Sequence, residues 1–497
     1  MTRHLPVLIP LILLVAAVLA PLAGLIRRRL AYRLAVLAVA ADAAVAVWGL
    51  AEVIRRGPIS YQLGGWAPPV GIEYVLDPLS AFFAAVIAVV ALIVMTGSGF
   101  MVDEELPHKH AHFFAAALLM LAGFQGIVVT GDLFNLFVFL EIGSLAGYAL
   151  VAVGEKPAPL AAMRYLLLGA TGASFYLLGL WFIYNLTGSL NMADVALIIP
   201  TVGDNPALLV GLTLVVVGIG VKMALFPLHG WLPDAYTQAP SAASALLAPI
   251  GTKVGAYALI RLLLFVFTVP LVRDRLPVTD VVLALSVAGI LYGSVMAIAQ
   301  RELKRMLAYS SVAQVGYIGL GIGLANPVGL VGAVLHVVNH AFMKAALFMV
   351  AGAMRARLGH SNIGHIDATL RRAMPWTMAA FTVGALSMIG IPPTAGFFSK
   401  WYLASGAVDR GLWVVVVVIM VSSLMNAVYF FRVLERAYLK GDAGTDGVSG
   451  ADPKGRTEAP FALLAPTLVL AAGILILGVL NAVLVRNVIE LIRPAGL

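Results

Sequence analysis

Residues 212–235 read LTLVVVGIGVKMALFPLHGWLPDA, an apolar run long enough to cross a bilayer as a helix, with Lys222 inside it. Two glycines precede this lysine, and Pro227 and Pro233 follow it. Proline inside a helix removes a backbone hydrogen bond and breaks the helix. The stretch therefore predicts a broken membrane-spanning helix that carries a buried cation.

A second stretch, GIPPTAGFFSK at residues 390–400, has the same character. Pro392 and Pro393 precede Lys400 there, again inside an apolar segment. Broken helices at corresponding positions of two halves are typical of transporters, in which they mark the ion site and an inverted repeat.

Composition extends this interpretation to the whole chain of 497 residues. Hydrophobic residues make up 61% and charged residues only 11%, whereas soluble domains carry about 25% charged residues. Cysteine is absent, which excludes disulfides, thiolate zinc sites and cysteine-ligated iron–sulfur clusters. The net charge of +8 comes from residues scattered over short loops, so we expect no nucleic-acid partner.

Hydropathy predicts an all-α polytopic membrane protein with about 14 spans. We expect their cores at 5–25, 31–54, 78–101, 112–130, 133–153, 164–186, 207–228, 243–270, 281–299, 305–325, 327–353, 376–403, 410–438 and 459–485. The first span ends at three arginines without a cleavage pattern, so we interpret it as an anchor. The longest polar stretch, about 441–458, is too short for a nucleotide or flavin site, and we expect no cofactor.

Lysine and arginine concentrate in the loops that follow odd-numbered spans. These loops include Arg27, Arg28, Arg29, Lys304 and Arg305. The positive-inside rule places this face in the cytoplasm. Both termini would then lie outside the cytoplasm, in a protein of the cell inner (plasma) membrane.

Several ionisable residues lie deep inside apolar runs, where a charge costs at least ~2.5–3.5 kcal/mol. We take them as candidates for proton translocation: Glu141, Lys222, Lys253, His336, His340, Lys344 and Lys400. The alternative is that such side chains extend to the interface. For Arg164 and Arg261 that alternative remains open.

His336, His340 and Lys344 are spaced i, i+4, i+8 and share one helical face. Two histidines at this spacing could bind a metal, but no acidic neighbour accompanies them, so we expect no metal site. A proton relay is the hypothesis we prefer, and hydrogen-bonded core histidines are the alternative. A buried lysine whose carboxylate partner moves near and away can gain and lose a proton, as a pump element must.

Five motifs in this order resemble the antiporter-like subunit family: GDLFNLFVFLEI, KMALFPLHGWLPDAYTQAPSAASALLA, LKRMLAYSSVAQVGY, LHVVNHAFMKAALFM and GIPPTAGFFSK. That family includes membrane subunits of respiratory complex I, of membrane-bound hydrogenases and of Mrp cation/proton antiporters. The resemblance implies 14 helices with two inverted five-helix repeats. It divides the chain into helices 1–3 (1–111), a first repeat (112–270), a second repeat (271–440), and a loop with helix 14 (441–497).

The resemblance also implies roles. Glu141 would pair with Lys222, and Lys253 would lead through the histidines toward Lys400. His229 and Asp234, in the HGWLPDA turn, would gate proton entry or merely cap a helix end.

Tyr236 after WLPDA and the chain length look like the D-type subunit of Mrp antiporters, whereas IPPTAGFFSKW also reads like complex I or hydrogenase relatives. We therefore expect a proton-translocating subunit of an Mrp-type Na⁺/H⁺ antiporter. The alternative is a proton-pumping, non-redox subunit of a complex I-type NADH-quinone oxidoreductase or a hydrogenase. Either implies other membrane subunits, the lipid bilayer and protons as partners, with Na⁺ added in the antiporter case.

Overall fold

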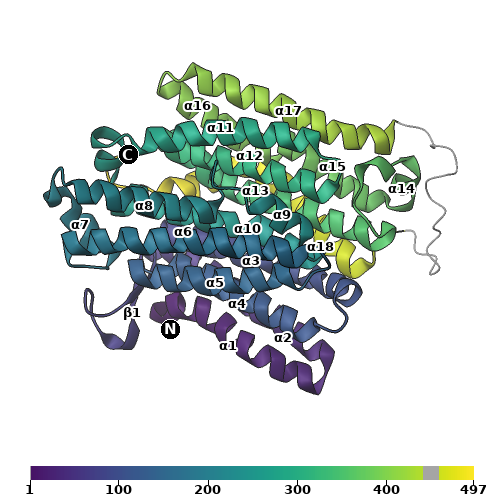
Figure 1. Ribbon diagram of the computed structural model, residues 1–497, viewed down its shortest axis with the longest axis horizontal. Helices are drawn as coiled ribbons and strands as arrows, with labels where there is room; N and C mark the ends of the chain where they lie inside the picture. The colour runs from purple at the N-terminus through teal and green to yellow at the C-terminus, as the bar shows by residue number, and fades with distance from the viewer. Residues whose placement is uncertain (1, 440–457) are drawn as a thin grey trace.

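The computed structural model describes residues 2–439 and 458–497, and these fold into a bundle of lengthwise helices (Figure 1). Within this part of the chain, 13 helices are long and apolar enough to cross a membrane. They are α1 (Leu5–Ile26), α2 (Arg28–Arg56), α3 (Pro78–Glu105), α4 (His110–Val129), α5 (Leu133–Ala152), α6 (Ala158–Thr187), α8 (Pro206–Met223), α10 (Ser241–Ile260), α11 (Val278–Ala299), α12 (Leu303–Leu324), α13 (Pro327–Leu358), α17 (Trp413–Tyr438) and α18 (Phe461–Val479).

The predicted all-α polytopic fold is confirmed, and so are both predicted breaks. Span 7 consists of α8, which ends at Met223, and the short helix α9 (Leu232–Gln238). Span 12, the one missing from the long helices, consists of two half-helices, α15 (Pro375–Ile389) and α16 (Ala395–Asp409). The inverted relation of the two repeats stays a prediction. The polar loop expected at 441–458 falls almost wholly outside the described residues.

Shorter elements lie between the spans, and the hydropathy pattern did not predict them. They are the antiparallel hairpin of β1 (Ile59–Gln62) and β2 (Glu73–Leu76), and the helices α7 (Met192–Val202), α14 (Ala368–Ala373) and α19 (Asn481–Asn487). α10 continues through a π-helical turn, Arg261–Val266. These segments are too short or too polar for a window of membrane-span length to detect.

Burial divides the bundle into a core and a periphery. In the most apolar 18-residue segments of α12, α13 and α10, 100%, 94% and 89% of the residues are buried. The corresponding shares are 39% in α6 and 33% in α17. α1 and α2 form one edge of the bundle, and α16 and α17 form the other (Figure 1). The chain ends lie at the same end of the bundle, the end that carries β1, whereas α14 lies at the opposite end (Figure 1).

Candidate functional site

The Lys222 ammonium lies in the last turn of α8 and faces α5. Its Nζ donates to Glu141 Oε1 at 3.3 Å, to Ser144 Oγ at 2.9 Å and to the Tyr148 hydroxyl at 3.3 Å. The predicted ion pair is therefore confirmed. Glu141, Ser144 and Tyr148 recur at i, i+3 and i+7, so one face of α5 supplies all three acceptors.

The break between α8 and α9 holds this lysine in place. Ala224 adopts a left-handed backbone conformation with φ of 62°, which ends α8. The Trp231 indole Nε1 donates to the carbonyl of Val221 at 2.8 Å, and the same carbonyl accepts from the Ala224 N–H at 3.1 Å. α10 approaches closely because it has Gly255 there, where a Cβ would stand 2.7 Å from Met223 Cα.

Lys253 is in the middle of α10 and is buried. Its Nζ donates to the carbonyl of Ala248 at 2.7 Å and to Thr252 Oγ1 at 3.3 Å. Among the described residues, neutral acceptors alone therefore hold this lysine. Among the hydrogen bonds of the described residues, none joins Lys222 to Lys253.

His336, His340 and Lys344 follow one face of α13, as their spacing predicted, and all three are fully buried. The two imidazole rings are stacked with centroids 5.9 Å apart. His336 Nδ1 shares a hydrogen bond of 2.9 Å with Ser399 Oγ, whereas both ring nitrogens of His340 lack a partner in the described part of the chain. Lys344 Nζ donates to the Leu307 carbonyl and to Ser310 Oγ, each at 2.6 Å.

Lys400 lies in α16 against the break of span 12. Its Nζ donates to the carbonyls of Met388 at 3.0 Å and Ile389 at 2.9 Å, and to Ser423 Oγ at 3.1 Å. The two carbonyls end α15, and the carbonyl end of a helix carries partial negative charge. The broken helix thus offers Lys400 only partial negative charge, whereas Lys222 has a full carboxylate.

These groups form one set, which we call the row: Glu141, Lys222, Lys253, His336, His340, Lys344 and Lys400. The helix α13, with the two histidines and Lys344, packs against α10, which carries Lys253, and against α16, which carries Lys400. Within residues 2–439 and 458–497, Lys222 is the one row lysine that has a carboxylate within ion-pair distance. In the described residues, no three His, Asp or Glu side chains gather as a metal site.

The two candidate gating residues have different surroundings. His229 is buried beside Phe226 and Tyr292, with ring centroids 5.4 and 4.9 Å away. Asp234, in the first turn of α9, pairs with Arg164 at 2.6 Å and Arg305 at 3.5 Å. Asp234 thus joins α9 to α6 and α12. Arg164, one of the two arginines for which an interfacial position was left open, is the α6 partner in this contact.

Comparison with known proteins places this bundle in a family. Residues 130–426, more than half of the chain, match the model of the NADH:quinone oxidoreductase/Mrp antiporter transmembrane family. The chain belongs to this family. The matched region contains every residue of the row, from Glu141 to Lys400, and confirms the resemblance seen in the motifs.

Individual members of this family cover most or nearly all of the chain. NADH-quinone oxidoreductase subunit N of Desulforudis audaxviator is 47% identical over 99% of each chain. The D subunit of the Na⁺/H⁺ antiporter of Alkalihalophilus pseudofirmus is 30% identical over 79% of each chain. A chain of the Mrp complex from Dietzia superposes with a TM-score of 0.87 at 28% identity, covering 99% of this chain and 96% of that one. The protein is therefore an antiporter-like, multi-pass membrane subunit of the Mrp/complex I family.

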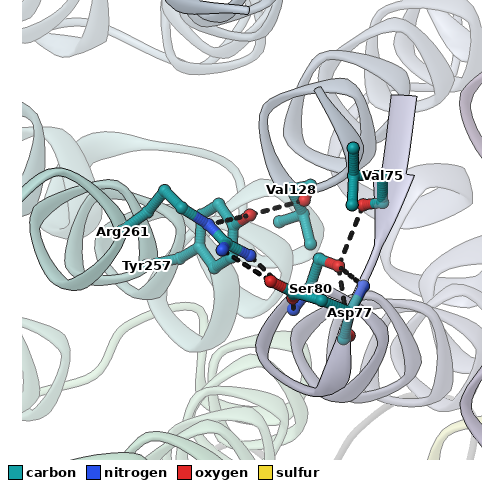
Figure 2. A network of polar contacts seen from close by, with 6 residues as sticks. All are labelled: Val75, Asp77, Ser80, Val128, Tyr257 and Arg261. Carbon is teal, nitrogen blue, oxygen red and sulfur yellow. Dashed lines mark hydrogen bonds and ion pairs between the residues drawn. The ribbon is translucent and has the colours of Figure 1, made fainter. Parts of the chain in front are cut away.

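A half-buried ion pair outside the row, between Arg261 and Asp77, was not predicted from sequence (Figure 2). Arg261, at the end of α10, donates to both oxygens of Asp77 at 2.6 and 2.7 Å, and its Nε donates to the Tyr257 hydroxyl at 3.2 Å. Burial alone would raise the pKa of Asp77, but the Arg261 guanidinium outweighs it and holds that pKa below the usual value. Arg261 is thus a paired residue that reaches the start of a neighbouring span, where Asp77 caps α3. In the sequence, Lys253, Tyr257 and Arg261 are spaced i, i+4, i+8 and so share one helical face. This spacing was the pattern that could have indicated a polar role for Arg261.

Two buried ionisable residues, Lys304 and Asp42, correct the sequence interpretation. Lys304, counted above among the cytoplasmic loop residues, is only 1% exposed, and its Nζ donates to the Ala239 carbonyl at 2.6 Å. α12 begins at Leu303, so this lysine belongs to a helix that is buried on all sides. Asp42, in the middle of span 2, is also 1% exposed and was overlooked. Its position in the centre of an apolar run would have been sufficient to identify it from the sequence as a buried ionisable residue.

Proposed function

We propose that this chain translocates protons across the membrane through the row. The observation that carries the proposal is the set of four row lysines, three of them buried and Lys222 with a side chain 9% exposed, that in the described part of the chain have a single carboxylate partner, Glu141. Lys253, Lys344 and Lys400 depend on carbonyl and hydroxyl groups, which accept hydrogen bonds from a lysine but do not neutralise it. A charge on any one of them therefore disfavours a charge on its neighbours.

This arrangement supports lateral transfer of charge. When Glu141 holds Lys222 in the charged form, repulsion favours a neutral Lys253. When the pair opens, a proton passes through water to Lys253 and then toward the α13 histidines and Lys400. The His340 nitrogens, buried without a partner among the described residues, are free to take and release a proton in this step. Coupling of distant sites follows because each transfer changes the electrostatic field at the next group.

For the parent complex we favour a redox-driven proton pump. Identity of 47% over 99% of both chains supports a role like that of NADH-quinone oxidoreductase subunit N, whereas the D subunit of the Na⁺/H⁺ antiporter reaches 30% over 79%. This reverses the order expected from Tyr236 and the chain length. Other membrane subunits would then be the partners, and this chain would hold no redox group. Mrp-type Na⁺/H⁺ antiport is the second candidate, favoured by the superposition on an Mrp chain.

Purification distinguishes these two candidates. The chain, tagged at its C-terminus and expressed in its own host, is extracted in mild detergent and its co-purifying subunits are identified by mass spectrometry. Subunits with iron–sulfur motifs are expected. Recovery of small membrane subunits alone, together with Na⁺-dependent proton exchange in the same membranes, would establish the antiporter instead. Protease protection of the tag in sealed vesicles also tests the predicted plasma-membrane orientation, with both termini outside the cytoplasm.

Transport through the row has its own test. Lys344→Met keeps the length of the side chain but removes the ionisable amine. Proton uptake into inverted vesicles should be abolished, while the amount of assembled complex is unchanged. Lys109→Met is the matched control, because Lys109 is exposed and donates to the Val153 carbonyl at 3.2 Å. Uptake by Lys344→Met equal to that of the control would refute the proposal.

A further inference from the structure

Asp42 is an acidic side chain in the N-terminal helices, outside the row. It lies at the middle of α2 (Arg28–Arg56) and is 1% exposed. The nearest charged residues along the same helix are Arg33 and Glu52, which are ~14 Å or more away along the axis. The carboxyl is therefore at the depth where the membrane interior is least polar.

The neighbouring helices bring no counter-charge to Asp42. α1 has no ionisable residue, and the ionisable groups of α3 and α4 lie at helix ends, as Asp103 and His110 do. Across the described residues no ion pair includes Asp42, unlike Asp77, which has Arg261. An unpaired buried charge is so unfavourable that such a group normally becomes neutral.

The hydrogen bonds around Asp42 are those of a neutral acid. Gln125 on α4 donates from Nε2 to Asp42 Oδ2 at 3.0 Å and to the Ala84 carbonyl on α3 at 3.1 Å. Asp42 Oδ1 and Gln125 Oε1 are buried and have no partner in the part of the chain that the structure describes. A carboxylate here would receive one neutral donor for a full charge, whereas a neutral acid leaves only its hydroxyl without a partner, which costs much less than an unpaired buried charge.

We infer that Asp42 is a proton-binding site that remains a neutral carboxylic acid at neutral pH, separate from the row. Its bound proton lies on Oδ1, the oxygen without a donor, and Gln125 hydrogen-bonds to Oδ2. This assignment depends on the burial of α2 in a membrane-spanning bundle and not on the proposed transport function. The acid links α2 to α3 and α4 through Gln125 while adding no charge to the interior.

Infrared spectroscopy of the intact, membrane-reconstituted complex tests this inference. A protonated carboxyl has a carbonyl stretch above the amide bands, where an ionised carboxylate does not absorb. The difference between wild type and Asp42→Asn at neutral pH should contain this band. Asp77→Asn is the matched control, because Asp77 is paired with Arg261 and should contribute no such band. A wild-type minus Asp42→Asn difference with only carboxylate bands would overturn the inference.

A second measurement needs no variant of Asp42. When the wild-type complex is labelled with ¹³C-carboxyl aspartate, the protonated-acid band should shift to lower frequency. Replacing the hydrogen-bond donor, as Gln125→Leu, should move the same band to higher frequency. Absence of any aspartate-derived acid band in the labelled wild type would refute the inference even if Asp42→Asn failed to fold.

Discussion

Replacing Glu141 by glutamine tests the carboxylate that pairs with Lys222 in the row. The change keeps the shape and a hydrogen-bond acceptor beside Lys222 but removes the charge. At 3.3 Å two unit charges attract each other by ~5 kcal/mol at an effective dielectric constant of about 20. The Glu141 side chain is 27% exposed, so solvent screens part of this, and we expect a loss of ~3 kcal/mol for the charged form of Lys222.

Such a loss lowers the population of charged Lys222 relative to neutral Lys222 by about 100-fold. Proton uptake into inverted vesicles, followed with a pH-sensitive dye, should fall by a similar factor, while the assembled complex remains. Ser144→Ala removes a single neutral acceptor at 2.9 Å and should have a smaller effect, ~1.5 kcal/mol.

Glu155→Gln is the matched control for this experiment. Glu155 is also paired, with Arg355 at 3.1 Å, but its side chain is 78% exposed. Surface pairs contribute about 0–1 kcal/mol, so uptake should not change. If Glu141→Gln retained the uptake of Glu155→Gln, the ion pair would have no part in translocation.

Three further predictions concern other parts of the bundle. Lys400→Ala should abolish proton uptake without loss of the folded complex; normal uptake would exclude the row as the route. Arg261→Ala leaves the half-buried Asp77 without its partner and should lower the free energy of unfolding by ~3 kcal/mol, the lower end of the range for buried pairs, measured as a lower thermal midpoint in detergent. Because the folded pKa of Asp77 lies below its unfolded value, the pair stabilises the wild type above about pH 4 and progressively less as pH falls through the folded pKa; a wild type and Arg261→Ala with parallel acid profiles would contradict this. His229→Ala combined with Asp234→Asn should slow proton uptake if the turn gates entry, whereas full uptake would assign Asp234 a structural role in joining helices.

The membrane-spanning helices could be predicted from sequence because they depend on properties local to each segment. Transfer of a helix into lipid is a sum over its own residues, so hydropathy identified the long helices. Pro227 and Pro393 indicated the two broken spans, since proline disrupts the helix in which it lies. The hairpin β1–β2 was missed because its strands are short and lie between spans.

The candidate residues of the row could also be identified from sequence, because the hydropathy around each residue is a local property. A lysine inside an apolar run is visible in any window, which identified Lys222, Lys253 and Lys400. Lys304 was misplaced because it stands one residue after the start of α12, where the pattern resembles a loop. Asp42 had the same central position as the predicted lysines and could have been found by the same rule.

The sequence by itself determined which charges enter the membrane and which helices break around them. Only the tertiary structure decided what each charge meets: a carboxylate 81 positions away for Lys222, the end of a broken helix for Lys400, an aspartate 184 positions away for Arg261. Hydropathy measures the free energy of transferring a residue alone, whereas the state of a buried charge depends on the few groups within a hydrogen bond of it. Those groups come together only when helices distant in sequence pack.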